Sequence, residues 1–291
     1  MKIKVRGAGK LHGILNGLMK AGESIRREVW QRIDNPTGAA RPAFLIGCGR
    51  SGTSMLVHQL NKSMRIELYN EDNPAAFERW RLKELSVIDR LIAESHARVI
   101  LFKPILDTYR ARTLMAKYLD ARFIFTFRHF DDVINSSLKR FGRMNRINHI
   151  NSWIQDDFSE FKLEPPPNVS RTAIQELWRP GLSPEDGAAL YWLFYNRLYY
   201  DLDLDKSERV MLMRYESVVS DPVRHFKALS EFLGLPYEPV LAEGVFSSSI
   251  RRESAPEIDL AIRKACEALW LRLSDEVGVR SETPQSHENR A

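Results

Sequence analysis

The sequence predicts an α/β fold of three layers (αβα), in which helices cover both faces of a central, mostly parallel β-sheet. Short apolar runs that are typical of buried strands alternate with helical patterns along most of the chain, and this alternation is characteristic of parallel sheets. With 291 residues, 44% of them hydrophobic, the chain is long enough to bury the core of one large domain. Its two cysteines, Cys48 and Cys266, lie far apart and in no metal-ligand spacing.

Four apolar runs are predicted to be the buried strands, namely 43–47, 99–103, 122–127 and 209–213. Helical patterns follow them at 52–62, 108–119, 131–140 and 221–234. A longer, aromatic-rich helix is expected from Ser183 to about Lys206, because Ser183 can cap its first turn and Pro184 fits there. Residues 143–182, which contain three consecutive prolines, are interpreted as a loop-rich insertion or a lid.

The chain divides into a basic amphipathic leader (1–42), a main domain (43–275) and a tail that is expected to be disordered (276–291). The leader holds nine basic and three acidic residues, a balance of +6, whereas the whole chain has a formal charge of +5. The remainder is therefore close to neutral, and no nucleic-acid partner is expected. The apolar residues of the leader recur every three or four positions, so an amphipathic helix is predicted that either packs on the main domain or lies on a membrane surface.

Membrane-spanning segments and secretory signals are not predicted. No run of about 18 or more apolar residues is present, and the N-terminus lacks the apolar core and cleavage pattern of a signal peptide. We therefore expect a cytoplasmic protein, with peripheral membrane contact through residues 1–42 as an open alternative.

The strongest motif is a glycine-rich turn, Gly-Cys-Gly-Arg-Ser-Gly-Thr-Ser at 47–54, directly between the first strand and its helix. Successive backbone N–H groups in such a turn can face one anion, and the helix N-terminus adds its positive dipole end. The turn has the outline of a P-loop, but Thr53 stands where a Walker A loop requires lysine. Arg50 and Ser51 supply a charge and a hydroxyl instead. The alternative is a tight turn that binds nothing.

A second motif begins where the third strand ends, at Arg128, with Ser136 eight residues later in the following helix. The carboxyl ends of adjacent parallel strands surround one crevice, so these two side chains could share one phosphate. The alternative is an ion pair of Arg128 with Asp131 or Asp132.

The residues that end the core strands also bear on metal use. A magnesium-dependent NTPase or kinase needs a carboxylate at the end of a core strand, whereas the second strand here ends in Lys103 and the third in Arg128. The crevice is therefore expected to bind a ligand with several separate anionic groups and to need no metal.

Together these residues resemble the superfamily of sulfotransferases that use 3′-phosphoadenosine-5′-phosphosulfate (PAPS), and the Arg-Ser-Gly-Thr form of the turn is similar to bacterial carbohydrate and tyrosylprotein sulfotransferases. A third stretch, 213–222 with 232–236 after it, is similar to the late strand-helix segment of the family, and the resemblance spans 41–273. It implies a P-loop-like fold, PAPS as co-substrate and a hydroxyl or amine acceptor, with carbohydrate or glycolipid favoured. Two features depart from the family: Arg128 is followed by His129-Phe130 instead of Asp-Pro, and no histidine follows Lys103.

The resemblance also implies roles for individual residues. Arg50 is assigned to the charge that develops on the leaving nucleotide, and Glu71, after a second-layer strand, is the expected base, with Asp72 as the near alternative. Lys103 either reaches the sulfuryl oxygens or pairs with Asp107, and His129 is left out as a positioning donor. The residues expected to bind PAPS and its product 3′,5′-ADP are Arg50, Ser51, Gly52, Thr53, Ser54, Arg128, Ser136, Arg251 and Arg252.

Two other classes of function stay open at this point. A P-loop kinase or NTPase is disfavoured by Thr53 and by the basic strand ends. A non-catalytic nucleotide-binding adaptor would be favoured if Glu71 and Asp72 both pointed away from the crevice.

Overall fold

A five-stranded parallel sheet forms the centre of the computed structural model, which describes residues 22, 25–157, 159, 164–248 and 250–282. Its strand order is β2-β5-β1-β6-β7, and every neighbouring pair is parallel. The strands are β1 (Arg41–Gly47), β2 (Ile66–Tyr69), β5 (Val99–Phe102), β6 (Arg122–Phe127) and β7 (Val210–Arg214). The four predicted strands are confirmed. The strand before Glu71 belongs to the edge of this sheet and not to a second layer.

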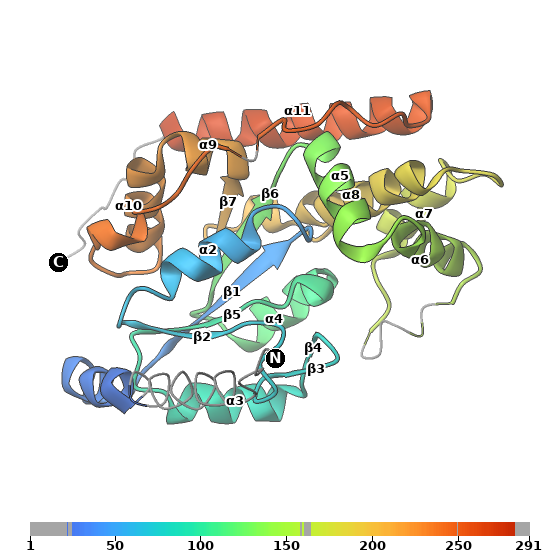
Figure 1. Cartoon of the computed structure of the whole chain (residues 1–291). Coiled ribbons are helices and arrows are strands. Elements are labelled where there is room, and N and C mark those ends of the chain that lie inside the picture. The colour runs from blue at the N-terminus through green and yellow to red at the C-terminus, as the bar shows by residue number, and fades with distance from the viewer. Residues whose placement is uncertain (1–21, 23–24, 158, 160–163, 249, 283–291) are drawn as a thin grey trace, which may run out of the picture.

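Helices cover both faces of the sheet, which confirms the three-layer αβα fold (Figure 1). Alternate residues of β1 point to opposite faces: Phe44 packs on one side, and Leu45 on the other. The Leu45 face is covered by α2 (Thr53–Leu60), α9 (Tyr215–Ser220) and α10 (Pro222–Phe232). The opposite face is covered by α3 (Leu85–Glu94), the η1–α4 segment (Ile105–Lys117), α5 (Phe130–Phe141), α8 (Pro184–Asp201) and α11 (Leu260–Glu282). A small hairpin of β3 (Phe77–Glu78) and β4 (Arg81–Leu82) lies outside the main sheet.

The helix predicted from Ser183 is present as α8, and the expected cap is formed. The Ser183 hydroxyl accepts from the backbone N–H of Asp186, while the Asp186 carboxylate accepts from the backbone N–H of Ser183. The helix ends at Asp201 instead of Lys206, because Asp203 adopts a left-handed conformation with φ of 54°. The aromatic residues of α8 are largely buried in the core, as predicted.

The interpretation of 143–182 as a loop-rich insertion is wrong for two segments, which form α6 (Met144–Ile154) and α7 (Asn168–Gln175). Both helices pack on α8. The approach of α6 depends on Gly187, where an added Cβ would lie 2.5 Å from the Cα of Ile147. Helix α6 has few apolar residues, so its helical pattern in the sequence is weak. The helix is stabilised when these residues pack against α8.

The two ends of the chain differ from their expected boundaries. Residues 25–34 are helical and pack on the main domain through Arg27, which donates to the carbonyls of Asn61, Ser63 and Ile66. Most of the leader lies outside the described residues, and β1 already begins at Arg41. At the other end, α11 continues to Glu282, so residues 276–282 are helical where disorder was expected, and residues 283–291 lie outside the described part.

None of the described helices is both long enough and apolar enough to cross a lipid bilayer.

Candidate functional site

The carboxyl ends of the parallel strands bring the predicted site residues to one edge of the sheet. In the order of the strands across the sheet, Glu71 follows β2, Lys103 follows β5, the glycine-rich turn follows β1, and Arg128 follows β6. The turn therefore lies between an acid–lysine pair on one side and Arg128 on the other. This order could not be deduced from the sequence, because strand order is a property of the sheet.

The glycine-rich turn is held in place by close backbone contacts. Gly47 has φ of 124°, and an added Cβ would lie 2.3 Å from the carbonyl oxygen of Thr126 on β6. Gly52 has φ of 85°, and an added Cβ would lie 2.1 Å from the ring of Tyr215. The backbone N–H of Gly47 donates to the hydroxyl of Thr108 at 2.9 Å. Only glycine can satisfy both the positive φ and the close contact at these two positions.

Polar groups of the turn are left available to a ligand. The hydroxyl of Ser51 is buried and has no hydrogen-bond partner within the part of the chain that the structure describes. Among the same residues, none accepts from the backbone N–H of Thr53 or Ser54, at the N-terminus of α2. Unpaired buried hydroxyls are uncommon, and helix N-termini favour anions. The turn therefore fits a phosphate or sulfate group.

Arg50 extends from this turn toward α5, and its Nε donates to the hydroxyl of Ser136 at 3.0 Å. Burial lowers the pKa of Arg50, and the positive charges of Arg140, Arg128 and Arg146 lower it further. Four arginines thus converge beside the turn, and their mutual repulsion would be relieved by a bound anion. Arg140 and Arg146 were not predicted from the sequence. Arg140 lies one helical turn beyond Ser136, which is a spacing that could have indicated it.

Arg128 and Ser136, which were expected to share one phosphate, each have a partner within the protein: Ser136 accepts from Arg50, and Arg128 pairs with an acid. Arg128 pairs with Asp132, whose carboxylate lies 2.9 Å from its Nη2, which is one of the alternatives raised above. The guanidinium also stacks over the ring of Tyr215, 4.6 Å from its centroid. Since Tyr215 also contacts Gly52, this ring connects Arg128 to the turn.

The late basic pair, Arg251 and Arg252, is exposed and lies near α5. The backbone N–H of Arg251 donates to the carboxylate of Asp132 at 3.1 Å. Asp132 therefore holds both Arg128 and the backbone of this late loop, so the two elements are positioned by one carboxylate.

On the other side of the turn, Glu71 forms an ion pair with Lys103 at 3.1 Å. Burial raises the pKa of Glu71, and the charge of Lys103 opposes that effect. Lys103 also donates to the side-chain oxygen of Asn70 at 3.1 Å. The alternative of a Lys103 pair with Asp107 is wrong, because Asp107 pairs with Arg81 at 3.1 Å.

Asp72 is exposed and accepts from the side chain of Asn70. Of the two candidate acids, Glu71 is therefore the one that faces a charged partner at the strand ends. Burial raises the pKa of the Glu71 carboxyl, which suits a group that takes up a proton.

Cys48, inside the turn, is buried, and burial raises its pKa to about 12, so its thiol is not a nucleophile at neutral pH. Within the described ranges, no three histidine, cysteine or acidic side chains gather as metal ligands would.

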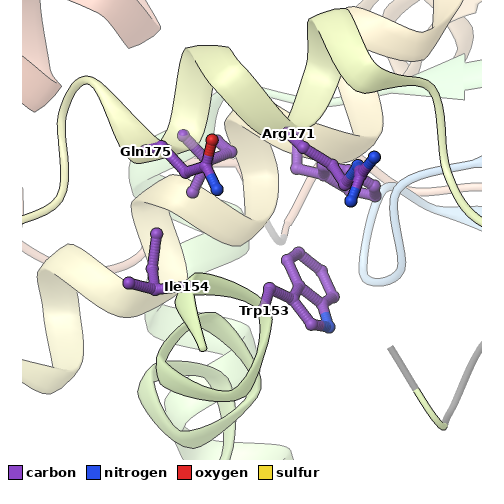
Figure 2. A pocket seen from close by; sticks show the side chains of 6 residues that line it. Trp153, Ile154, Arg171 and Gln175 are labelled. Carbon is purple, nitrogen blue, oxygen red and sulfur yellow. The ribbon is translucent and has the colours of Figure 1, made fainter. Parts of the chain in front are cut away.

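A small cavity lies elsewhere, between α6, α7 and α8 (Figure 2). Its volume is about 10 Å³, which is room for roughly one water molecule. It is lined by Trp153, Ile154, Arg171, Ile174, Gln175 and Phe194. None of the predicted site residues lines this cavity.

Comparisons with known proteins agree with the sequence motifs. A family model described as sulfotransferase domain matches residues 40–255. Similar solved structures include a sulfotransferase from Alicyclobacillus acidocaldarius, at 17% identity over 85% of this chain and 98% of that chain, with a TM-score of 0.45. The sulfotransferase domain from the curacin biosynthetic pathway is 15% identical over 79% of this chain and 98% of that chain (TM-score 0.49). A mouse sulfotransferase complexed with PAP is 14% identical over 84% and 89% of the two chains (TM-score 0.39). A search of curated proteins found no match.

The contact of Gly52 with Tyr215 predicts that Gly52→Ala lowers the free energy of unfolding, by about 3 kcal/mol for the positive φ and the overlap together. Gly181→Ala is the control, because Gly181 has φ of 84° but nothing within 4 Å of an added Cβ. Urea unfolding of the two variants isolates the contribution of the overlap. Equal losses in both variants would mean that the Tyr215 ring yields without cost.

Proposed function

This chain belongs to the sulfotransferase domain family, and on that premise we propose that it transfers a sulfuryl group from PAPS to a hydroxyl or amine group of an acceptor. The observation that carries the proposal is the arrangement at the strand ends. A turn with available N–H and hydroxyl groups lies between an acid–lysine pair and an arginine cluster. Such a site can hold a donor with two separate anionic groups beside a base.

In this proposal the turn binds the 5′-phosphosulfate through Arg50, Ser51, Gly52, Thr53 and Ser54. Arg128 and Ser136 bind the 3′-phosphate, with Arg251 and Arg252 approaching it from the late loop. The pairing of Arg128 with Asp132 is compatible with this role, because Asp132 fixes the direction of the guanidinium as well as the loop backbone. Arg50 lies between the two groups of donors through its contact with Ser136.

Transfer then proceeds in line. Glu71 takes the proton of the acceptor hydroxyl, the acceptor oxygen forms a bond to sulfur, and the bond from sulfur to the bridging oxygen breaks. The electron pair of that bond stays on the 5′-phosphate of the leaving 3′,5′-ADP, where Arg50 and the N–H groups of the turn offset its charge. Lys103 holds the Glu71 carboxylate and presents a positive charge beside the acceptor oxygen.

The adaptor alternative requires that Glu71 and Asp72 both point away from the crevice. The ion pair of Glu71 with Lys103, at the end of β5, argues against that alternative. The kinase alternative lacks support from the strand ends, which are basic at Lys103 and Arg128. For the acceptor we propose a carbohydrate or glycolipid, following the resemblance of the turn to carbohydrate sulfotransferases.

A lipid-linked acceptor would suit peripheral membrane contact through residues 1–42, which we include in the proposal. In the described part of this leader, Ile25, Val29 and Ile33 are spaced by four residues and are 63%, 53% and 75% exposed. They form one apolar stripe on a helix that carries Arg26 and Arg32. A basic helix with an exposed apolar stripe can lie in the interface of an anionic membrane.

The donor site predicts tight binding of 3′,5′-ADP that needs no metal. In calorimetric titration, Arg128→Ala combined with Ser136→Ala is expected to weaken this binding by at least about a hundredfold, through loss of two phosphate contacts. Arg112→Ala, an exposed arginine that pairs with Asp203, is the control. Binding of ATP with magnesium in place of 3′,5′-ADP would reject the sulfotransferase proposal in favour of the kinase alternative.

The base assignment predicts that Glu71→Gln lowers kcat by about a hundredfold or more, while the affinity for 3′,5′-ADP is retained. Because the pKa of Glu71 is raised, its carboxylate takes up a proton at a higher pH than an ordinary glutamate would. The wild-type rate is therefore expected to fall on acidification in a higher pH range than an unperturbed glutamate base would give. Transfer of radiolabelled sulfate from PAPS to a panel of sugars and glycolipids measures both effects. Asp72→Asn is the control, and a larger loss in that variant would reverse the assignment of the two acids.

Membrane contact predicts that the protein floats with anionic liposomes and that deletion of residues 1–40 abolishes flotation. The triple variant Ile25→Gln, Val29→Gln, Ile33→Gln is expected to reduce flotation, because the exposed stripe loses its apolar surface. Leu271→Gln, an exposed leucine on α11, controls for a general loss of surface hydrophobicity. Equal recovery of the full-length and truncated proteins would refute the contact.

A further inference from the structure

Arg146 is a buried arginine beside the glycine-rich turn that the proposed donor site does not use. It lies near the start of α6, and only 6% of its surface is exposed. Its Nη2 lies 3.9 Å from the position of an added Cβ on Gly49. The same position is 3.9 Å from the side chain of Ile105, which follows Lys103 closely in the chain. Arg146 therefore faces the part of the turn that points toward the end of β5.

The guanidinium of Arg146 is held in a fixed plane. It lies over the ring of Tyr191, 3.8 Å from the centroid, and over the ring of Phe141, 4.4 Å from the centroid. Its Nε donates to the hydroxyl of Ser137 at 3.0 Å. These contacts orient the side chain without neutralising it, since aromatic rings and a hydroxyl carry no net charge.

No carboxylate within the described residues forms an ion pair with Arg146. By contrast, the buried Arg128 pairs with Asp132, and the half-buried Arg81 pairs with Asp107. A buried charge without a counter-charge is costly, and Arg146 also adds to the positive field that lowers the pKa of Arg50. A bound anion would compensate both effects.

We propose that Arg146 binds a further oxyanion on the Gly49 side of the turn, in addition to the two phosphates of 3′,5′-ADP. The inference rests on the proposed function and deepens it. Two sources share this chemistry: the sulfonate of PAPS itself, or an anionic group on the acceptor close to the reacting hydroxyl. The planar guanidinium, whose Nη2 lies near Gly49 of the turn, suits binding of either anion.

The test compares the wild type with Arg146→Gln in three calorimetric titrations, with 3′,5′-ADP, with PAPS, and with inorganic sulfate added to the protein in the presence and absence of 3′,5′-ADP. Arg143→Gln is the matched control, because Arg143 lies on the neighbouring turn of the chain, is exposed and pairs with Glu185. We expect the affinity of Arg146→Gln for 3′,5′-ADP to stay within about threefold of the wild type, and its affinity for sulfate to fall by about tenfold or more.

The titrations with PAPS and with sulfate distinguish the donor sulfonate from an anionic group of the acceptor. If Arg146 holds the donor sulfonate, the variant also loses the preference of the wild type for PAPS over 3′,5′-ADP. If it holds an acceptor anion, that preference stays and only sulfate binding to the 3′,5′-ADP complex is lost. Unchanged sulfate affinity together with an unchanged preference for PAPS overturns the inference.

Failure of the proposed function is distinguishable from failure of this inference. A wild type that binds no 3′,5′-ADP contradicts the former. A wild type that binds 3′,5′-ADP, together with an Arg146→Gln variant that changes neither the sulfate affinity of the complex nor the preference for PAPS, contradicts only the latter. If Arg146→Gln does not fold, Arg146→Lys serves instead, since lysine keeps the positive charge but lacks the planar guanidinium that can bind an anion through two N–H groups. It is then expected to weaken sulfate binding by at least about threefold, and unchanged sulfate binding in this folded variant would count against Arg146 as the anion ligand.

Discussion

The close packing at the two ends of the glycine-rich turn is the constraint from which the rest of the site follows. At Gly47 the chain leaves β1 so near to Thr126 of β6 that no side chain fits between them. At Gly52 the chain enters α2 against the ring of Tyr215. Between these contacts the segment turns into α2, where the backbone N–H groups of Thr53 and Ser54 have no acceptor among the described residues. The geometry that the proposed anion site relies on is thus a consequence of packing and not of any one charged residue.

The charges around the turn have an unusual balance. Arg50, Arg128, Arg140 and Arg146 converge, while one nearby carboxylate, Asp132, binds Arg128 and the backbone of the late loop. A cluster of this kind is unfavourable in the absence of an anion, because burial weakens the screening that water supplies. A bound anionic ligand would supply the missing negative charge and so stabilise the folded protein.

The acid–lysine pair occupies the opposite side of the turn and has a different character. Glu71 and Lys103 compensate one another, so this side is close to neutral overall. Burial keeps the pKa of Glu71 raised in spite of the lysine. The order of the strands therefore places the arginine cluster on one side of the turn and the Glu71–Lys103 pair on the other. In the proposed mechanism the first side binds the donor, the second takes up the proton, and the reacting group lies between them.

Local pattern in the sequence by itself determined the αβα class, four of the five central strands, the capped start of α8 and the glycine-rich turn, because alternation, capping and turn chemistry are properties of neighbouring residues. It did not reveal α6, α7 or α11, whose apolar residues become helical faces only against α8 and the sheet. Only the tertiary structure decided that Asp132 pairs with Arg128, that Glu71 and not Asp72 meets Lys103, and that Arg146 lies beside Gly49. Each of these contacts joins strand ends or helices that packing alone brings together, and packing partners distant in sequence leave no local signal.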